Sequence, residues 1–148
     1  MNSVPRTMRC ARRIAMSVCA VLLTTHAICG WSQEIKVALS GNQEIPPVTT
    51  SASGVGTITV NADRSVVGSV TFTGMSATVA HIHEAAAGAN GLIIVPLTRT
   101  ADNPNLWTVP PGAKLTDAQY ESYKAGNLYF NIHSEANRGG EIRGQIKP

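Results

Sequence analysis

The chain has 148 residues, with 12 lysines and arginines against 9 aspartates and glutamates, which gives a formal net charge of +3. The positive excess belongs to the N-terminus: without residues 1–32, 148 − 32 = 116 residues remain, with 12 − 4 = 8 basic residues, 9 acidic residues and no cysteine. This remainder, with a net charge of −1, excludes a disulfide scaffold, a cysteine-ligated zinc site, a cysteine nucleophile and a basic nucleic-acid-binding surface.

The N-terminal segment has the pattern of a secretory signal peptide. Residues 1–13 are basic, and residues 14–23 form an apolar stretch that is shorter than the roughly 20 residues needed to span a bilayer. Small side chains at Gly30 and Ser32 predict cleavage before Gln33, although a cut after Cys29 competes and an uncleaved anchor is the alternative. We therefore expect residues 1–32 to be removed and residues 33–148 to form one secreted or periplasmic domain without an integral membrane segment.

Alternating apolar residues predict short strands along most of the remaining chain. The predicted strands cover residues 35–39, 55–60, 65–72, 78–83, 92–97, 107–109, 128–133 and 141–146. Glycine, asparagine and proline separate them, as is typical of an all-β sandwich or barrel. One helix is predicted over residues 117–125, because Thr116 suits an N-cap, Asp117 suits the first turn and Gly126 suits the end.

Three histidines are the candidate functional residues of this domain. His81 and His83 are two positions apart in a predicted strand, so their side chains project from the same face. His133 ends another predicted strand and shares a face with Tyr129 and Asn131. Three neutral imidazoles suit copper or zinc, so these residues predict a metal site if the fold brings His133 to the other two. Structural hydrogen bonding by the histidines is the competing interpretation.

The segment that follows His133 carries a glutamate and an arginine with the same two-residue spacing. Glu141 and Arg143 are expected on one face of the last strand, where an ion pair that only stabilises the fold is the favoured interpretation. Glu141 is also a candidate fourth ligand, or a group that accepts a histidine N–H behind the metal. Asn90-Gly91 reads as a turn and not as part of a site.

Several segments, taken together and in order, resemble the CHRD domain, a repeat first described in chordin and found singly in many exported bacterial proteins. They are Leu39–Val48, Ala80–His83, Asn90–Gly91, Tyr129–His133 and Gly139–Gln145. The resemblance extends over residues 35–146 and implies a Greek-key β-sandwich of the immunoglobulin-like or superoxide-dismutase-like kind. Chordin's growth-factor binding does not carry over to a lone exported domain.

The His-x-His strand is also similar to the copper-binding strand of copper–zinc superoxide dismutases. Those enzymes use further histidine and aspartate ligands and a disulfide, whereas this domain has three histidines and no cysteine. A complete dinuclear site is therefore excluded, and only His81, His83 and His133 match copper ligands. We expect an exported binding or structural module that holds one copper or zinc ion, with an unknown extracytoplasmic protein or small ligand as partner. The alternative is a metal-dependent redox enzyme at the same histidines.

Overall fold

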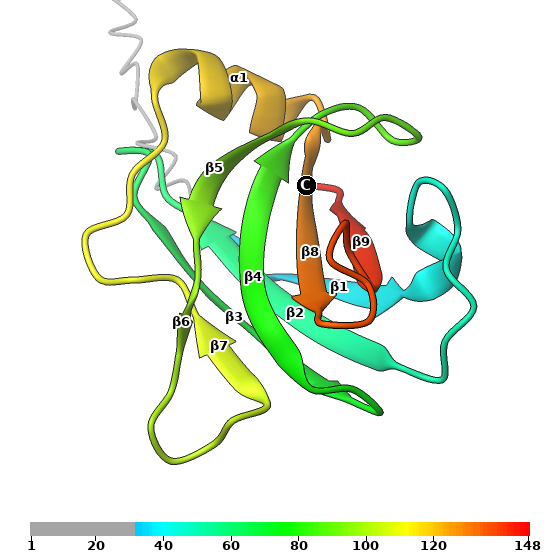
Figure 1. The fold of residues 1–148 in the computed structure, drawn as a ribbon. Coiled ribbons are helices and arrows are strands. Elements are labelled where there is room, and N and C mark those ends of the chain that lie inside the picture. The colour runs from blue at the N-terminus through cyan, green and yellow to red at the C-terminus, as the bar shows by residue number, and fades with distance from the viewer. Residues whose placement is uncertain (1–31) are drawn as a thin grey trace, which may run out of the picture.

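A computed structural model describes residues 32–148 (Figure 1). Residues 1–31 of the predicted signal segment, with its three cysteines, lie outside the described residues, so export and cleavage stay predictions. Over the described range the chain forms nine strands, one α-helix and a short 3-10 helix. The strands are β1 (Ile35–Ser40), β2 (Ser53–Val60), β3 (Val66–Thr73), β4 (Ala77–Glu84), β5 (Leu92–Pro96), β6 (Thr98–Arg99), β7 (Leu106–Thr108), β8 (Leu128–Ser134) and β9 (Ile142–Ile146).

All nine strands belong to one antiparallel sheet in the order β5-β4-β8-β9-β1-β2-β3-β7-β6, which curls until it is nearly closed into a barrel (Figure 1). The expected all-β class is confirmed, but the expected division into two sheets is not seen. The halves β5-β4-β8-β9 and β1-β2-β3-β7-β6 stay joined because Ser40 of β1 pairs with Arg143 of β9. That single aligned pair makes one curled sheet of what would otherwise be the two layers of a sandwich.

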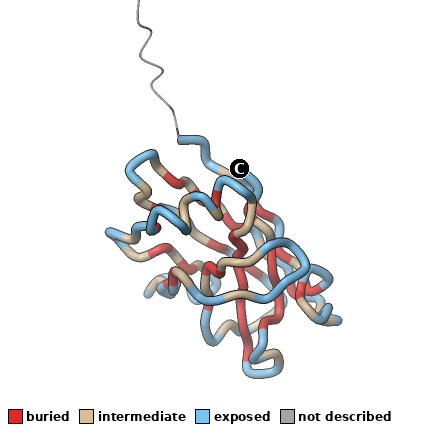
Figure 2. The backbone as a smooth tube through the Cα atoms, turned by 90° about the horizontal axis from the view of Figure 1, so that it is seen from above, coloured by how far each residue is buried: buried red, intermediate tan, exposed pale blue. Residues whose placement is uncertain are grey.

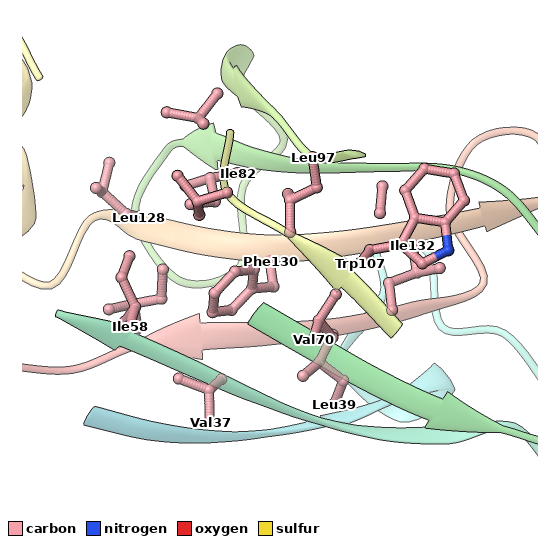
Figure 3. Packing of buried hydrophobic residues seen from close by; sticks show 14 of the residues in the cluster. Val37, Leu39, Ile58, Val70, Ile82, Leu97, Trp107, Leu128, Phe130 and Ile132 are labelled. Carbon is pink, nitrogen blue, oxygen red and sulfur yellow. The ribbon is translucent and has the colours of Figure 1, made fainter. Parts of the chain in front are cut away.

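The core fills the inside of this curled sheet (Figure 3). Strand alternation predicts that Ile82, Phe130, Ile132 and Ile142 face inward, and each has an exposed fraction of at most 1%. Side chains alternate across a strand, so the histidines next to them in sequence project from the outer face. Buried backbone runs through the middle of the molecule, and exposed segments lie at its periphery (Figure 2).

The helix α1 (Asp117–Lys124) connects β7 to β8 and begins as predicted. The hydroxyl of Thr116 accepts a hydrogen bond from the Gln119 N–H, while the Gln119 side chain accepts one from the Thr116 N–H. This reciprocal capping satisfies two N–H groups that the first helical turn leaves free. Gly126, with φ of 73°, follows the helix in the left-handed conformation that glycine adopts easily. No helix within residues 32–148 is long and apolar enough to cross a membrane.

Three loops cover the outer face of β8 and β9. They are residues 41–48, which begin with the 3-10 helix η1 (Gly41–Gln43), residues 85–91, and residues 135–141. The first two loops are tied together, because the Asn90 amide donates to the Ile45 carbonyl over 2.8 Å. Under this cover every residue of β8 is buried, on both faces of the strand. The outward side chains of β8 therefore lie in a second, polar interior.

Candidate metal centre

The pairing of β4 with β8 brings the three histidines together. His81 lies opposite Asn131, and Val79 lies opposite His133, so His133 is the diagonal neighbour of His81 on the outer face. Diagonal neighbours in an antiparallel pair are close enough for long side chains to meet. His83 follows two positions after His81 and projects from the same face. The sequence forces only the relation between His81 and His83, whereas the approach of His133 depends on this register.

The three imidazoles form a compact group. Their ring centroids are 5.6 Å apart for His81 and His83, 5.2 Å for His81 and His133, and 6.1 Å for His83 and His133. One nitrogen from each ring can be chosen so that all three lie within 4.8 Å of one another. His83 and His133 have exposed fractions of 8% and 9%, whereas His81 is only half-buried. The group therefore reaches solvent on the His81 side.

Backbone carbonyls fix the orientation of the two deeper rings. His83 Nδ1 lies 3.0 Å from the Gly91 carbonyl oxygen, and His133 Nδ1 lies 2.9 Å from the Arg138 carbonyl oxygen. A carbonyl oxygen only accepts, so each Nδ1 carries the hydrogen and each neutral ring keeps its lone pair on Nε2. Histidine metal ligands commonly have this arrangement, in which the second ring nitrogen donates to a carbonyl behind the site.

These bonds leave Nε2 free on both rings. His83 Nε2 is buried and has no hydrogen-bond partner among the described residues. His133 Nε2 lies 3.3 Å from His81 Nδ1 and accepts its hydrogen. A buried acceptor without a donor costs free energy, and a metal ion would satisfy it. Coordination through His81 Nδ1 requires that ring to move its hydrogen to Nε2.

The surroundings favour the neutral form of all three imidazoles. Burial, with the neighbouring His133 and His83, lowers the pKa of His81 to about 4. Burial also lowers the pKa of His83, against the bond to the Gly91 carbonyl, and the charges of His133 and Arg143 lower it further. Burial lowers the pKa of His133, against its bond to the Arg138 carbonyl. Neutral imidazole is the form that coordinates a metal ion, so the site is held in its binding form.

The spacing of the donors fits an ion with little rearrangement. Zinc–nitrogen bonds of about 2.0–2.1 Å at tetrahedral angles place two ligand nitrogens about 3.3 Å apart. The pair His81 Nδ1 and His133 Nε2 already has this separation, at 3.3 Å. The 4.8 Å limit of the group shows that the remaining pairs of nitrogens need to close by at most about 1.5 Å.

The structure does not bring Glu141 into this group. Its carboxylate accepts a hydrogen bond from the Thr50 hydroxyl over 2.7 Å, and His133 donates to the Arg138 carbonyl instead. Burial acts to raise the pKa of Glu141, but hydrogen bonds from Ser134, Thr50 and Asn137 bring it below its ordinary value. Glu141 precedes β9, so the same-face spacing expected within one strand does not apply to it. The expected role as fourth ligand or hydrogen-bond acceptor behind the metal therefore has no support in its contacts.

The expected ion pair between Glu141 and Arg143 is wrong. Within residues 32–148, no carboxylate lies within 4.0 Å of the Arg143 guanidinium. The guanidinium instead donates to the Asn90 side-chain oxygen, the Ala89 carbonyl and the Gln145 side-chain oxygen. It also lies over the Tyr129 ring, with 3.5 Å from Cζ to the ring centroid. Arg143 thus holds the 85–91 loop onto the outer face.

A buried carboxyl group lies in the same polar layer. Glu44, 4% exposed, accepts a hydrogen bond from the Asn131 amide at 3.4 Å. Its Oε1 and the Asn131 side-chain oxygen have no donor among the described residues. Burial raises the pKa of Glu44 to about 7, although Arg143, Asn131 and the Ile45 backbone act to lower it. A pocket of about 600 Å³ lies beside Glu44 and Arg143, and Lys36 and Lys147 also line it.

Sequence reasoning missed the residues that support the histidines. Gly91 contributes its carbonyl to His83 and its N–H to the Tyr129 hydroxyl, so the Asn90-Gly91 turn is part of the site after all. Tyr129 stacks on His83, with ring centroids 4.9 Å apart and planes 12° from parallel. The shared face of Tyr129, Asn131 and His133 was the available signal. Only the loop contacts show that this face is covered.

The comparisons with known proteins identify the family of this chain. The family model of the CHRD domain matches residues 35–146, which are 112 of the 148 residues. No curated protein and no solved structure matches the chain. The match contains β1 to β9 and all three histidines of the candidate metal centre. The chain therefore belongs to the CHRD domain family.

Proposed function

We propose that this protein binds one copper or zinc ion through His81, His83 and His133, and that it acts as an exported metal-binding module. The observation that carries the proposal is a group of three histidines with nitrogens within 4.8 Å of one another, in which two rings are held by carbonyls through Nδ1 and His83 Nε2 is buried without a partner among residues 32–148. Structural hydrogen bonding alone does not account for that orphaned nitrogen. Imidazole donors without a carboxylate suit copper and zinc, and disfavour magnesium or calcium.

The side of the site at His81 is open to solvent, and this affects the chemistry that a bound ion could carry out. Three histidines leave tetrahedral zinc one ligand short, and His81 is half-buried, so water or an external ligand can reach the fourth position. Structural zinc sites have four protein ligands, whereas catalytic sites keep one position open. This feature supports a second candidate, a metal-dependent redox enzyme, in which the same three residues hold copper.

Titration of metal-free protein, purified without a chelating tag, tests the metal site. We expect one Cu or Zn ion per chain and a melting temperature that rises with metal concentration. The His81→Ala/His83→Ala variant should lose both effects. Val79→Ala is the matched control, because Val79 lies two positions earlier on the same strand and is 42% exposed. Equal binding by the wild type and the double variant, or none by either, returns the histidines to a structural role.

A redox assay on the copper-loaded protein separates the two candidates. A binding module should show no turnover above that of the metal-free protein. Turnover that disappears in the double variant while the Val79→Ala control keeps it would establish the enzyme.

Export is the setting of this proposal and is supported by the N-terminal sequence alone. The basic segment, the short apolar stretch and the small residues before Gln33 favour cleavage there. Intact mass of protein recovered from outside the cytoplasm should correspond to a chain that begins at Gln33. A mass that retains Met1 would contradict the proposal.

A further inference from the structure

We infer that Arg143 biases the three-histidine site toward a monovalent ion, Cu(I), and against a divalent ion such as Zn(II). This inference rests on the metal site proposed above and concerns its selectivity. The feature that carries it is a stack of three side chains, in which the Tyr129 ring lies between the Arg143 guanidinium and the His83 imidazole.

The stack sets an upper limit on the distance between the guanidinium and the metal ligand. Arg143 Cζ is 3.5 Å from the Tyr129 ring centroid, and that centroid is 4.9 Å from the His83 ring centroid. Cζ therefore lies at most 3.5 + 4.9 = 8.4 Å from the centre of His83. Tyr129 is 1% exposed, so protein and not solvent fills the space between the charge and the ring. Screening by salt is weak for such a buried arrangement.

The positive charge is buried and only partly compensated. Arg143 is 2% exposed, and its hydrogen bonds go to the neutral oxygens of Asn90, Ala89 and Gln145. Arg143 acts to lower the pKa of Glu44, but burial raises this pKa to about 7, so much of Glu44 is protonated, and therefore uncharged, near neutral pH. Two further cations, Lys36 and Lys147, line the pocket beside them and add positive charge.

The ligands themselves add no negative charge. His81, His83 and His133 are neutral donors, and Glu141 is bonded to Thr50 outside the group. The field of Arg143 therefore acts on the full charge of the bound ion. With a metal–nitrogen bond of about 2.0–2.1 Å, the ion lies about 3.2 Å from the centre of the His83 ring, and so at most about 11.6 Å from Cζ. At that distance and an effective dielectric constant of about 20, each additional unit of charge on the ion lowers affinity by roughly tenfold. Cu(I) and Zn(II) both have filled d shells, so the comparison between them isolates charge from geometric preference.

The test compares the affinities of Cu(I) and Zn(II) in matched variants. Cu(I) is measured anaerobically against a competing chelator, and Zn(II) is measured in the same buffer. Arg143→Gln removes the charge, so the ratio of Zn(II) affinity to Cu(I) affinity should rise roughly tenfold. Lys114→Gln is the control, because it removes an exposed cation that does not line the pocket beside Glu44 and Arg143, and its ratio should match the wild type. Arg143→Lys keeps the charge and should stay close to the wild-type ratio.

A second variant moves the ratio in the opposite direction and leaves the loop contacts of Arg143 in place. Glu44→Gln, compared with the wild type at pH 8, removes the negative charge that opposes Arg143. The ratio of Zn(II) to Cu(I) affinity should then fall. Because this variant shows whether a buried charge of the polar layer reaches the ion, an unchanged ratio in Glu44→Gln overturns the inference if Arg143→Gln does not fold.

The outcomes distinguish this inference from the proposed function. A wild type that binds neither ion refutes the metal site itself. A wild type that binds both, with a ratio unchanged in Arg143→Gln and in Glu44→Gln, refutes only the role of Arg143. Equal weakening of both ions by Arg143→Gln also overturns the inference, because it shows that Arg143 supports the fold of the site and not its charge selectivity.

Discussion

The two faces of β8 are equally buried and chemically opposite. Leu128, Phe130 and Ile132 point into the curled sheet, with exposed fractions of 0–1%. Tyr129, Asn131 and His133 point outward under the loops, with exposed fractions of 1%, 3% and 9%. The inner face packs apolar side chains against one another, whereas the outer face is held by directed hydrogen bonds and ring stacking.

This difference separates the source of stability from the source of function. Apolar burial on the inner face stabilises the fold roughly in proportion to area. The outer face instead contains three polar atoms that have no partner within residues 32–148, on Glu44, His83 and Asn131, and imidazoles whose pKa values are lowered by burial. Such groups cost free energy in a protein without ligands. The stability of the apolar core offsets this cost, so the polar layer can retain groups that are able to bind an ion.

The largest expected effect comes from the inner face. Ile132→Ala removes a side chain that is 0% exposed and should lower the free energy of unfolding by about 2–5 kcal/mol, because it leaves a cavity in a closed core. Urea denaturation measures the loss. Val67→Ala, at a position 56% exposed on β3, is the control and should change stability by less than about 0.5 kcal/mol. A loss below about 1 kcal/mol for Ile132→Ala would mean that Ile132 lies on the outer face of β8 and not on the inner one.

Local patterns were enough to predict the inner face. Period-two alternation identified the inward positions of β4, β8 and β9, and Thr116 and Gly126 located the helix to within one residue at its end. The same alternation placed His81 and His83 together. These predictions succeeded because they depend on residues near one another in the chain.

The outer face could not be predicted in this way. Its cover depends on contacts between distant segments, such as that of Asn90 with the Ile45 carbonyl, 45 residues away. The predicted Glu141–Arg143 pair failed because β9 begins after Glu141, and Arg143 is bonded instead to the 85–91 loop. The single sheet in place of a sandwich likewise depends on one long-range pairing, between Ser40 and Arg143.

A smaller effect is expected from the buried acid of the outer face. Its pKa rises from 4.5 to about 7 on folding, so the folded state holds the Glu44 proton more tightly than the unfolded state does. This contribution to stability is complete below pH 4.5 and is lost as pH rises through 7. Glu44→Gln removes the dependence and should stabilise the protein by up to roughly 3 kcal/mol at pH 8, and little at pH 4.5.

Unfolding by urea at several pH values, with the variant compared to the wild type at each, measures this effect. The difference between the two proteins cancels the titration of the histidines, which both share. A constant difference across the range would show that Glu44 is not the group responsible.

The next effect concerns the close packing of Gly140 against Glu44 and Asn131. A Cβ atom at Gly140 would lie 2.6 Å from the Asn131 side-chain oxygen and 2.7 Å from Glu44 Oε1, and its φ of 134° is one that other residues rarely adopt. Gly140→Ala should therefore lower the free energy of unfolding by about 1–3 kcal/mol. Gly139→Ala is the neighbouring control, because nothing lies within 4 Å of its added Cβ. Equal stabilities of the two variants would contradict the close packing of this layer.

The smallest expected effect is the change in metal affinity between pH 7.5 and pH 6. Three histidines with the ordinary pKa of about 6.5 would lose affinity by roughly 50-fold or more over this range, because each must be neutral to bind. Burial lowers the pKa of all three here, that of His81 to about 4, so His81 stays neutral at pH 6 and protonation competes less with metal binding at the other two rings. The affinity should fall by less than about 14-fold, which is the loss expected if only His81 stayed neutral, and the loss should come at lower pH. Titration of metal-free protein with zinc at both pH values measures this directly. A steep loss of metal affinity centred near pH 6.5 would mean that water reaches the three histidines and that the outer face of β8 is not a closed polar layer.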